Sequence, residues 1–189
     1  MKKLLSFFIL LLIVVFSYSA LSIEDFKEST HAGTRKDPVP TLDGYKNVTI
    51  ADTWTGKSVA SVDVAVSGVI RGELANSILK IFNPYNDDPE TNKEYAFVYV
   101  YVRNVKDYTG KDEPIEIDAS SFYVVDKDFN RTKISTHVDM DEQLKAEIYE
   151  GGKAEGFVVC QVKPNEIFYL QINGVWFEIN AVSDPFSQL

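Results

Sequence analysis

The feature that most constrains the fold is a run of alternating aromatic and aliphatic residues at positions 94–105. Because successive side chains of a strand point to opposite faces, the run gives a strand with two apolar faces. The aromatic face holds Tyr95, Phe97, Tyr99 and Tyr101, and the aliphatic face holds Ala96, Val98, Val100 and Val102. A strand that is apolar on both faces is usually covered on both sides. We therefore expect a central strand, with the core on at least one side of it.

Turn residues divide the remaining chain into short apolar runs, which is typical of a sandwich or barrel rather than of βαβ units. Valines alternate with small or polar residues over 58–70, which predicts a half-buried strand, and Gly68 within it predicts a bulge. Further strands are expected at 45–51, 115–117, 122–125, 131–134, 144–149, 156–162, 167–172 and 175–179. The sequence thus predicts an all-β fold.

Other local signals predict one helix and three turns. Leu74, Ile78 and Phe82 recur at helical spacing, so residues 73–82 are expected to form a short helix that covers an end or a face of the sandwich. Residues 126–130 are expected to form the turn between two strands. Gly151-Gly152 and Asn173-Gly174 are expected to form hairpin turns.

The first 19 residues have the order of a secretory signal. Lys2 and Lys3 precede an apolar run at 4–16, and small residues follow, which places the cut after Ser19, with Ser22 as second choice. The alternative is an uncleaved membrane anchor over 4–21. The expected organisation is a signal peptide (1–19), a polar linker (20–32), an immunoglobulin-like β-sandwich (33–181) and a C-terminal tail (182–189).

Charge and cysteine content exclude some classes of protein. The formal net charge is −9, which has the wrong sign for binding nucleic acid or anionic lipid. Cys160 is the one cysteine, so no disulfide can form within the chain. The fold is therefore expected to be held by burial and hydrogen bonding.

Five blocks of the sequence, in order, carry a family resemblance. They are residues 33–38 (GTRKDP), 69–75 (VIRGELA), 83–95 (beginning NPYN and ending KEY), 144–156 (with YEGG and EG) and 174–177 (GVWF). Together they resemble the immunoglobulin-like domain of unknown function found in exported proteins and lipoproteins of Gram-positive bacteria. That family is similar in fold to a secreted immunoprotective antigen of mycobacteria. Many members carry a lipid-bearing Cys after the leader, and this chain has none there.

The resemblance implies an immunoglobulin-like antiparallel β-sandwich outside the membrane. It implies no enzymatic activity and no cofactor, and it transfers no site residues to this chain. Similarity of fold is by itself a weak basis for inferring function.

The residues offer few candidates for catalysis or metal binding. Cys160 and His137 are the one possible thiol and base, but Cys160 lies in an apolar run that predicts a buried, inert thiol. Residues 126–130 start like a calcium loop but lack its later ligands. Acidic loops at 87–90 and 139–142 are interpreted as solvated charges, and His31 with His137 is too few ligands for zinc. No catalytic, cofactor or metal residues are therefore predicted.

The aromatic residues leave one binding alternative open. Tyr99, Tyr101, Trp54 and Trp176 could form a flat patch for a sugar or a protein partner. For Trp176 and the two tyrosines burial in the core is the favoured interpretation, because they lie within apolar strands. Trp54 lies at a turn, and the two interpretations are balanced there.

The function expected from these observations is a non-catalytic extracytoplasmic binding domain, whose partner is a protein or a cell-envelope component. The alternative is a structural or regulatory domain that inhibits or stabilises a co-exported enzyme or a membrane protein. A hydrolase is the third choice. No nucleic acid partner is expected, and contact with a membrane is expected only if the leader is uncleaved.

Overall fold

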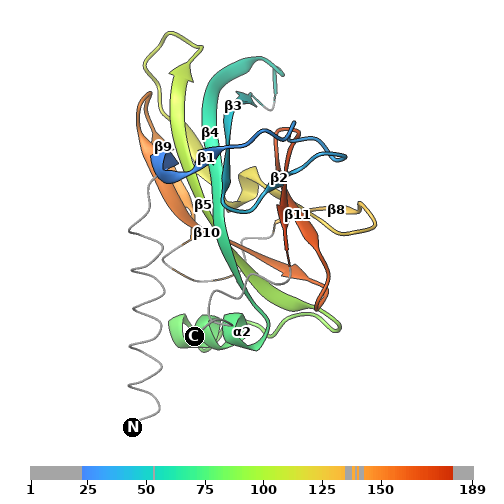
Figure 1. The fold of residues 1–189 in the computed structure, drawn as a ribbon. Helices are drawn as coiled ribbons and strands as arrows, with labels where there is room; N and C mark the ends of the chain where they lie inside the picture. The colour runs from blue at the N-terminus through green and yellow to red at the C-terminus, as the bar shows by residue number, and fades with distance from the viewer. Residues whose placement is uncertain (1–22, 53, 135–137, 139, 141–142, 181–189) are drawn as a thin grey trace.

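The computed structural model describes residues 23–180, apart from 53, 135–137, 139 and 141–142 (Figure 1). The predicted signal peptide at 1–19, both predicted cleavage positions and the predicted tail at 182–189 lie outside these residues. No helix of the described part is long and apolar enough to cross a membrane.

The described part of the chain forms a β-sandwich with one α-helix, as predicted. The first sheet has the order β1-β3-β4-β5-β10, from β1 (Lys27–Glu28), β3 (Asp43–Ala51), β4 (Ser58–Arg71), β5 (Glu94–Asp107) and β10 (Lys153–Val162). The second sheet has the order β2-β12-β11-β7-β8, from β2 (Val39–Pro40), β12 (Val175–Ile179), β11 (Phe168–Ile172), β7 (Tyr123–Val125) and β8 (Arg131–Lys133). β6 (Ile115–Asp118) and β9 (Lys145–Ile148) form a separate ribbon. Two short pairs, β1 with β3 and β2 with β12, are parallel, and the other pairs are antiparallel.

The central position predicted for residues 94–105 is confirmed. β5 lies between β4 and β10, and its two faces belong to two different cores. Val98 and Val100 face the second sheet, where the main core lies, whereas Phe97 and Tyr99 belong to a smaller core with α2 (Glu73–Phe82). Figure 1 shows the sheets packed against each other, with α2 beside one end of β4 and β5. The first sheet is thus the middle layer of the molecule.

The strand predicted at 58–70 is confirmed, but the prediction that it is half-buried is wrong. β4 is buried continuously from Ala60 to Ile70, because the first sheet is covered on both faces. Its small polar residues, such as Ser61, are buried together with the valines. The bulge predicted at Gly68 is confirmed by a register shift against β5 between Val66 and Gly68.

The predicted helix has the predicted bounds, Glu73–Phe82. Its buried stripe is Ala75, Ile78 and Leu79, which pack against the aromatic face of β5. The helix begins after Gly72, whose φ of 73° favours glycine. It ends at Asn83, whose N–H donates to the carbonyl of Leu79.

Two predicted connections differ in the structure. The described part of the predicted linker, residues 23–32, is attached to the first sheet through η1 (Ile23–Asp25) and β1, because the side chain of Ile23 is buried in the smaller core. Gly151-Gly152 is a turn, but it joins strands of different sheets, since β9 pairs with β6 and β10 pairs with β5. Its backbone instead exchanges two hydrogen bonds with Asn104 of β5.

The second sheet has one face in the main core and one face outward. Phe168, Leu170 and Ile172 of β11 point inward, so Tyr169 and Gln171 between them point outward. Asn173-Gly174 forms the predicted hairpin turn to β12, with φ of 43° and 87°. The turn predicted at 126–130 joins β7 to β8.

Candidate functional site

The environment of the one cysteine disfavours the thiolate, the nucleophilic form of the side chain. Cys160 lies on β10 in the main core, and its Sγ is 3.7 Å from the carbonyl oxygen of Ala96. Burial raises the pKa of the Cys160 thiol to about 12. It borders a cavity of about 310 Å³ that also involves Tyr95 and Gln161. The structure therefore agrees with a buried thiol, and His137 lies outside the described residues.

The acidic and histidine candidates that the structure describes do not converge on a metal site. Within the part of the chain that the structure describes, no group of three or more His, Cys, Asp or Glu residues could hold a metal ion. Asp88 pairs with Lys80 and Glu90 pairs with Lys93, while the second acidic loop falls largely outside the described residues. The Nδ1 atom of His31 lies 2.6 Å from Asp37 on the surface.

The aromatic patch proposed from the sequence divides into three places. Tyr99 and Tyr101 are buried in the smaller core, as favoured. Trp54 is 94% exposed in the turn after β3. The core interpretation of Trp176 is wrong, because on β12 its neighbours Val175 and Phe177 pack with the main core, which directs Trp176 to the outer face.

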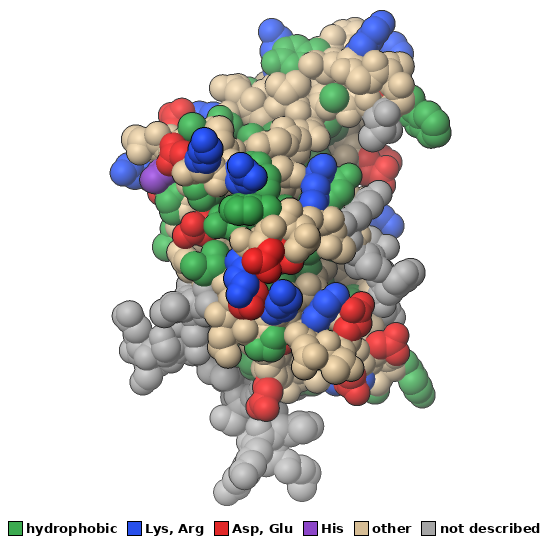
Figure 2. Space-filling view, turned by 90° about the vertical axis from the view of Figure 1, so that its right-hand side faces the viewer, with side chains coloured by type: hydrophobic (Ala, Val, Ile, Leu, Met, Phe, Trp, Pro, Cys, Tyr) green, Lys and Arg blue, Asp and Glu red, His purple; other side chains and the backbone are tan. Residues whose placement is uncertain are grey.

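Three rings meet on that outer face, and we call Phe129, Tyr169 and Trp176 the aromatic platform. Their centroids lie 6.1 Å apart for Phe129 and Tyr169, 6.3 Å for Phe129 and Trp176, and 5.7 Å for Tyr169 and Trp176. Figure 2 looks at the molecule from the side of the second sheet, and hydrophobic side chains gather there with Lys or Arg side chains beside them. The planes of Phe129 and Tyr169 differ by 21°, whereas Trp176 meets these two rings edge-to-face at 71° and 70°. The cluster therefore offers ring faces and edges to a ligand and leaves no cage between the rings.

Phe129 is held on the platform by an unusual backbone conformation. Its φ is 65°, in the left-handed region that a bulky residue rarely adopts. Asn or Asp occupies five of the seven described non-glycine positions with positive φ, and Leu42 is the other exception. Such a conformation costs about 1–2 kcal/mol for an L-residue. Strained residues cluster at functional sites, and this one presents a ring that is 46% exposed.

The carboxylate of Asp126 fixes the turn that carries Phe129. It accepts hydrogen bonds from the backbone N–H groups of Asp128 and Asn130 and from the side chain of Asn130. Desolvation raises the pKa of Asp126, but the hydrogen bonds from Asn130 and Asp128 outweigh it and hold that pKa below its usual value. The turn predicted from its Asp and Asn residues is thus confirmed, and its function in the structure is to present the ring.

The first block of the family resemblance places a cation above the platform. The guanidinium carbon of Arg35 lies 4.9 Å from the centroid of the Phe129 ring. The loop is closed by mutual backbone hydrogen bonds between Thr34 and Asp37, and the N–H of Trp176 donates to the carbonyl of Gly33. A Cβ on Gly33 would lie 2.8 Å from the ring of Tyr45 and 2.9 Å from Val175, so only glycine fits there.

A second cation lies over a second ring on the same face. Tyr123 of β7 carries the guanidinium of Arg131, whose central carbon is 3.4 Å from the ring centroid. Gln171 is the direct cross-strand partner of both Tyr123 and Trp176, so it lies between the two aromatic groups. Its side-chain oxygen is buried and has no hydrogen-bond partner among the described residues.

Arg71 and Arg103 of the first sheet differ from Arg35 and Arg131 in their ion pairs, although Arg71 also lies over a ring, that of Phe168, at 5.6 Å. Arg71 is ion-paired to Glu94, and Arg103 is ion-paired to both Glu24 and Asp63. Within the described ranges, Arg35 and Arg131 contact no carboxylate. Their guanidinium groups therefore keep donors available for a ligand.

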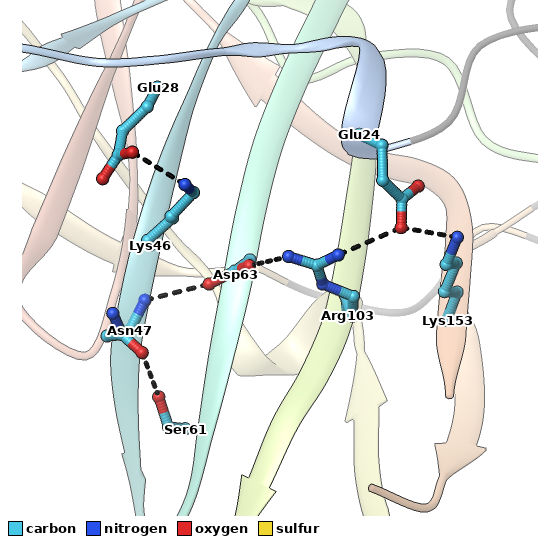
Figure 3. A network of polar contacts seen from close by, with 8 residues as sticks. All are labelled: Glu24, Glu28, Lys46, Asn47, Ser61, Asp63, Arg103 and Lys153. Atoms are coloured by element: carbon cyan, nitrogen blue, oxygen red, sulfur yellow. Dashed lines mark hydrogen bonds and ion pairs between the residues drawn. The ribbon is translucent and has the colours of Figure 1, made fainter. Parts of the chain in front are cut away.

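A polar network of the first sheet has a structural role (Figure 3). Asp63 accepts from the backbone N–H of Asn47 and from Arg103, and a hydrogen bond to Asp63 raises the pKa of Arg103 above its usual value. Glu24 bridges Arg103 at 3.0 Å and Lys153 at 2.7 Å. All of these charges are paired, so the network attaches the segment around Glu24 to the first sheet.

Sequence reasoning found Trp176 as a candidate but missed its neighbours. The alternation of Phe168, Tyr169 and Leu170 could have indicated that Tyr169 faces outward. Phe129 lies in a turn that the sequence identifies by its Asp and Asn residues, and this pattern does not indicate where the Phe129 ring lies. Arg35 was noted only as part of a family block, and nothing local indicates that it reaches Phe129, which is 94 positions away in the sequence.

Comparisons with known proteins add similar folds. No family model and no curated protein matches the chain. Similar solved structures include YcdA of Bacillus subtilis, assigned as a lipoprotein, with 16% identity and a TM-score of 0.48 over 70% of this chain and 40% of that one. They also include the secreted protein MPT63 of Mycobacterium tuberculosis, with 10% identity and a TM-score of 0.45 over 76% and 97% of the two chains. A conserved hypothetical protein of Bacillus anthracis has 17% identity and a TM-score of 0.39 over 72% and 97%.

This chain spans about two fifths of the YcdA structure and nearly all of the other two. All three TM-scores are below 0.5, so the function is argued from the residues of this chain.

Proposed function

We propose that this chain is a non-catalytic, extracytoplasmic binding domain and that its aromatic platform holds a saccharide of the cell envelope. The immunoglobulin-like identity of the sandwich belongs to the same proposal, as does the export of the chain by the leader at 1–19. The observation that carries the proposal is the exposed ring of Phe129, held at a φ of 65° against Tyr169 and Trp176.

The chemistry of a sugar ring suits this surface. The C–H face of a pyranose is apolar and carries partial positive charge, so it packs against the negative face of an aromatic ring. Its hydroxyl groups remain free to bond with polar side chains at the border of the platform. Arg35 and Arg131 provide such donors next to the rings.

Other ligand classes fit less well. A quaternary ammonium group needs rings arranged around it, and the platform rings touch one another. A stable protein interface takes about 20–30 residues a side, with a large apolar centre. The platform is small and bordered by exposed charged residues.

Binding of the exported protein to immobilised polysaccharides tests the proposal. Trp176→Ala and Tyr169→Ala are each expected to weaken binding about tenfold or more, as truncation of an aromatic anchor does. Trp54→Ala is the matched control. Trp54 is an exposed aromatic residue, and it takes part in none of the ring contacts of the platform. If neither platform variant weakens binding relative to Trp54→Ala, the platform is not the binding surface.

A further inference from the structure

We infer that the saccharide is anionic, carrying carboxylate or phosphate groups that bind Arg35 and Arg131 on either side of a sugar ring stacked on the platform. This inference rests on the proposed function and specifies its ligand. It starts from the contrast between Arg71 and Arg103 of the first sheet and the two arginines near the platform. Arg71 and Arg103 hold carboxylates, whereas Arg35 and Arg131 hold none among the described residues.

The position of each guanidinium over a ring leaves it available to an anion. A guanidinium that packs on a ring and holds no carboxylate keeps N–H donors that match the two oxygens of a carboxylate or a phosphate. Arg35 lies over Phe129 at 4.9 Å, and Arg131 lies over Tyr123 at 3.4 Å. Both side chains are exposed, so a ligand can reach them from solvent.

The surface between the two cations fits a sugar. Along the second sheet, β11 separates Trp176 on β12 from Tyr123 on β7, and Gln171 of β11 pairs with both. The unpartnered oxygen of Gln171 is an acceptor, and leaving such a buried group without a donor costs about 1–3 kcal/mol. A hydroxyl group is a donor that would satisfy it. Because the oxygen is covered, this bond requires a small movement of the side chains above it.

Charge complementarity favours an anionic ligand over a neutral one. The chain as a whole carries a net charge of −9, which disfavours passive adhesion to anionic polymers. Arg35 and Arg131, which contact no carboxylate among the described residues, form a local exception on a face that also carries Glu178, the cross-strand partner of Tyr169. The shared chemistry is an acidic sugar polymer, and the anion is either a uronate carboxylate or a phosphodiester.

Calorimetric titration of the exported protein with three oligosaccharides of equal length tests the inference. The ligands are oligogalacturonate, a sugar oligomer linked by glycerol phosphate, and neutral oligogalactose. At low salt we expect at least one acidic ligand to bind about tenfold or more tightly than oligogalactose, and added salt to weaken it. The ligand that binds distinguishes the carboxylate from the phosphate source.

Variants separate the charge contribution from the platform. Arg35→Gln and Arg131→Gln are each expected to weaken the acidic ligand about tenfold and to leave oligogalactose unchanged. Lys57→Gln, which removes one charge from the exposed turn before β4, is expected to change neither.

The outcomes are distinguishable. Equal binding of acidic and neutral ligands, with loss on Trp176→Ala, would overturn the anionic ligand and leave the proposed function in place. If the acidic ligand binds equally well to both arginine variants, the assignment of Arg35 and Arg131 as its binding residues is wrong. If Trp176→Ala alters no saccharide binding and the face binds a purified exported protein instead, both the inference and the proposed function fail.

Discussion

At the scale of single residues, Phe129 connects backbone conformation to the proposed function. Most non-glycine positive-φ positions among the described residues hold Asn or Asp, which tolerate that region, and Phe129 does not belong to this class. Its ring instead stacks near Tyr169 with an interplanar angle of 21°. We interpret the strained backbone of Phe129 as the conformation that is needed to place its aromatic ring on the platform.

Substitution of Phe129 is therefore expected to affect binding more than stability. Phe129→Gly relieves about 1–2 kcal/mol of backbone strain but adds about 0.5–1 kcal/mol of chain entropy and loses a ring contact. The free energy of unfolding should stay within about 1 kcal/mol of the native value, measured by denaturant titration, while saccharide binding falls. Phe129→Asn is the control with a residue that suits the backbone. A loss of stability of several kcal/mol would show that Phe129 is a core residue.

The carboxylates of Asp37 and Asp126 hold the loops next to the platform, and their pKa values predict how the stability of the fold responds to acid. Backbone donation from Ala32 and the contact with His31 lower the pKa of Asp37, and hydrogen bonds lower the pKa of Asp126 despite desolvation. A group with a lowered folded pKa stabilises the fold above its unfolded pKa of about 4 and loses this contribution as the pH falls through the folded value. Stability should therefore fall as the pH drops below about 4.

Thermal unfolding at a series of pH values tests this expectation. Asp126→Asn should be less stable at neutral pH, because it loses the charged acceptor, and should lose less stability on acidification than the native chain does. An unchanged acid response in Asp126→Asn would mean that this turn carries no part of it.

At the scale of secondary-structure elements, the sequence predicted the strands well where the hydrophobic pattern is local. β5 is central because its two faces are apolar, and α2 has the predicted bounds because its apolar residues recur at helical spacing. The pattern failed for β4, since Ser61 and Asp63 look solvent-facing in the sequence yet are buried by distant segments. It also failed for Trp176, because an apolar neighbourhood does not say which face of a strand is covered.

The central strand carries a clear stability prediction. Phe97 is 1% exposed and packs against Phe157 with ring centroids 5.7 Å apart, so Phe97→Ala should cost about 3–5 kcal/mol. Trp54 is at an exposed turn, so Trp54→Ala should cost less than about 1 kcal/mol. Equilibrium denaturation of the two variants compares them directly. A larger loss for Trp54→Ala would contradict the assignment of the core.

At the scale of the whole molecule, the segment at 23–28 is part of the domain through the network in Figure 3. Arg103 connects Glu24 of this segment to Asp63, whose side chain is only 7% exposed. Arg103→Gln should cost about 2–3 kcal/mol, because it leaves the Asp63 carboxylate without its charged partner. Lys153→Gln removes only the exposed side of the Glu24 bridge and should cost less than about 1 kcal/mol.

Denaturant titration of the two variants checks this difference. Similar losses in both would indicate that the segment is held by the burial of Ile23 alone. The sequence could not predict this attachment, since Glu24, Asp63 and Arg103 lie in three separate parts of the chain and only the folded sheet brings them together.

The same limit explains how much of the candidate site could be predicted. The all-β class, the turn at 126–130 and the hairpin at Asn173-Gly174 follow from local patterns. The three rings of the platform and Arg35 come together from two loops and two strands. Their convergence depends on the order of the strands in the sheet. No local pattern in one sequence carries that order.

The most direct test of the account is the fluorescence of Trp176 during a saccharide titration. The chain has two tryptophans, so Trp54→Phe leaves Trp176 as the single reporter. We predict that the acidic oligosaccharide changes the emission of Trp176 and that the change saturates at the dissociation constant obtained by calorimetry. Unchanged emission from Trp176 while calorimetry still records binding would place the ligand elsewhere and contradict the central claim.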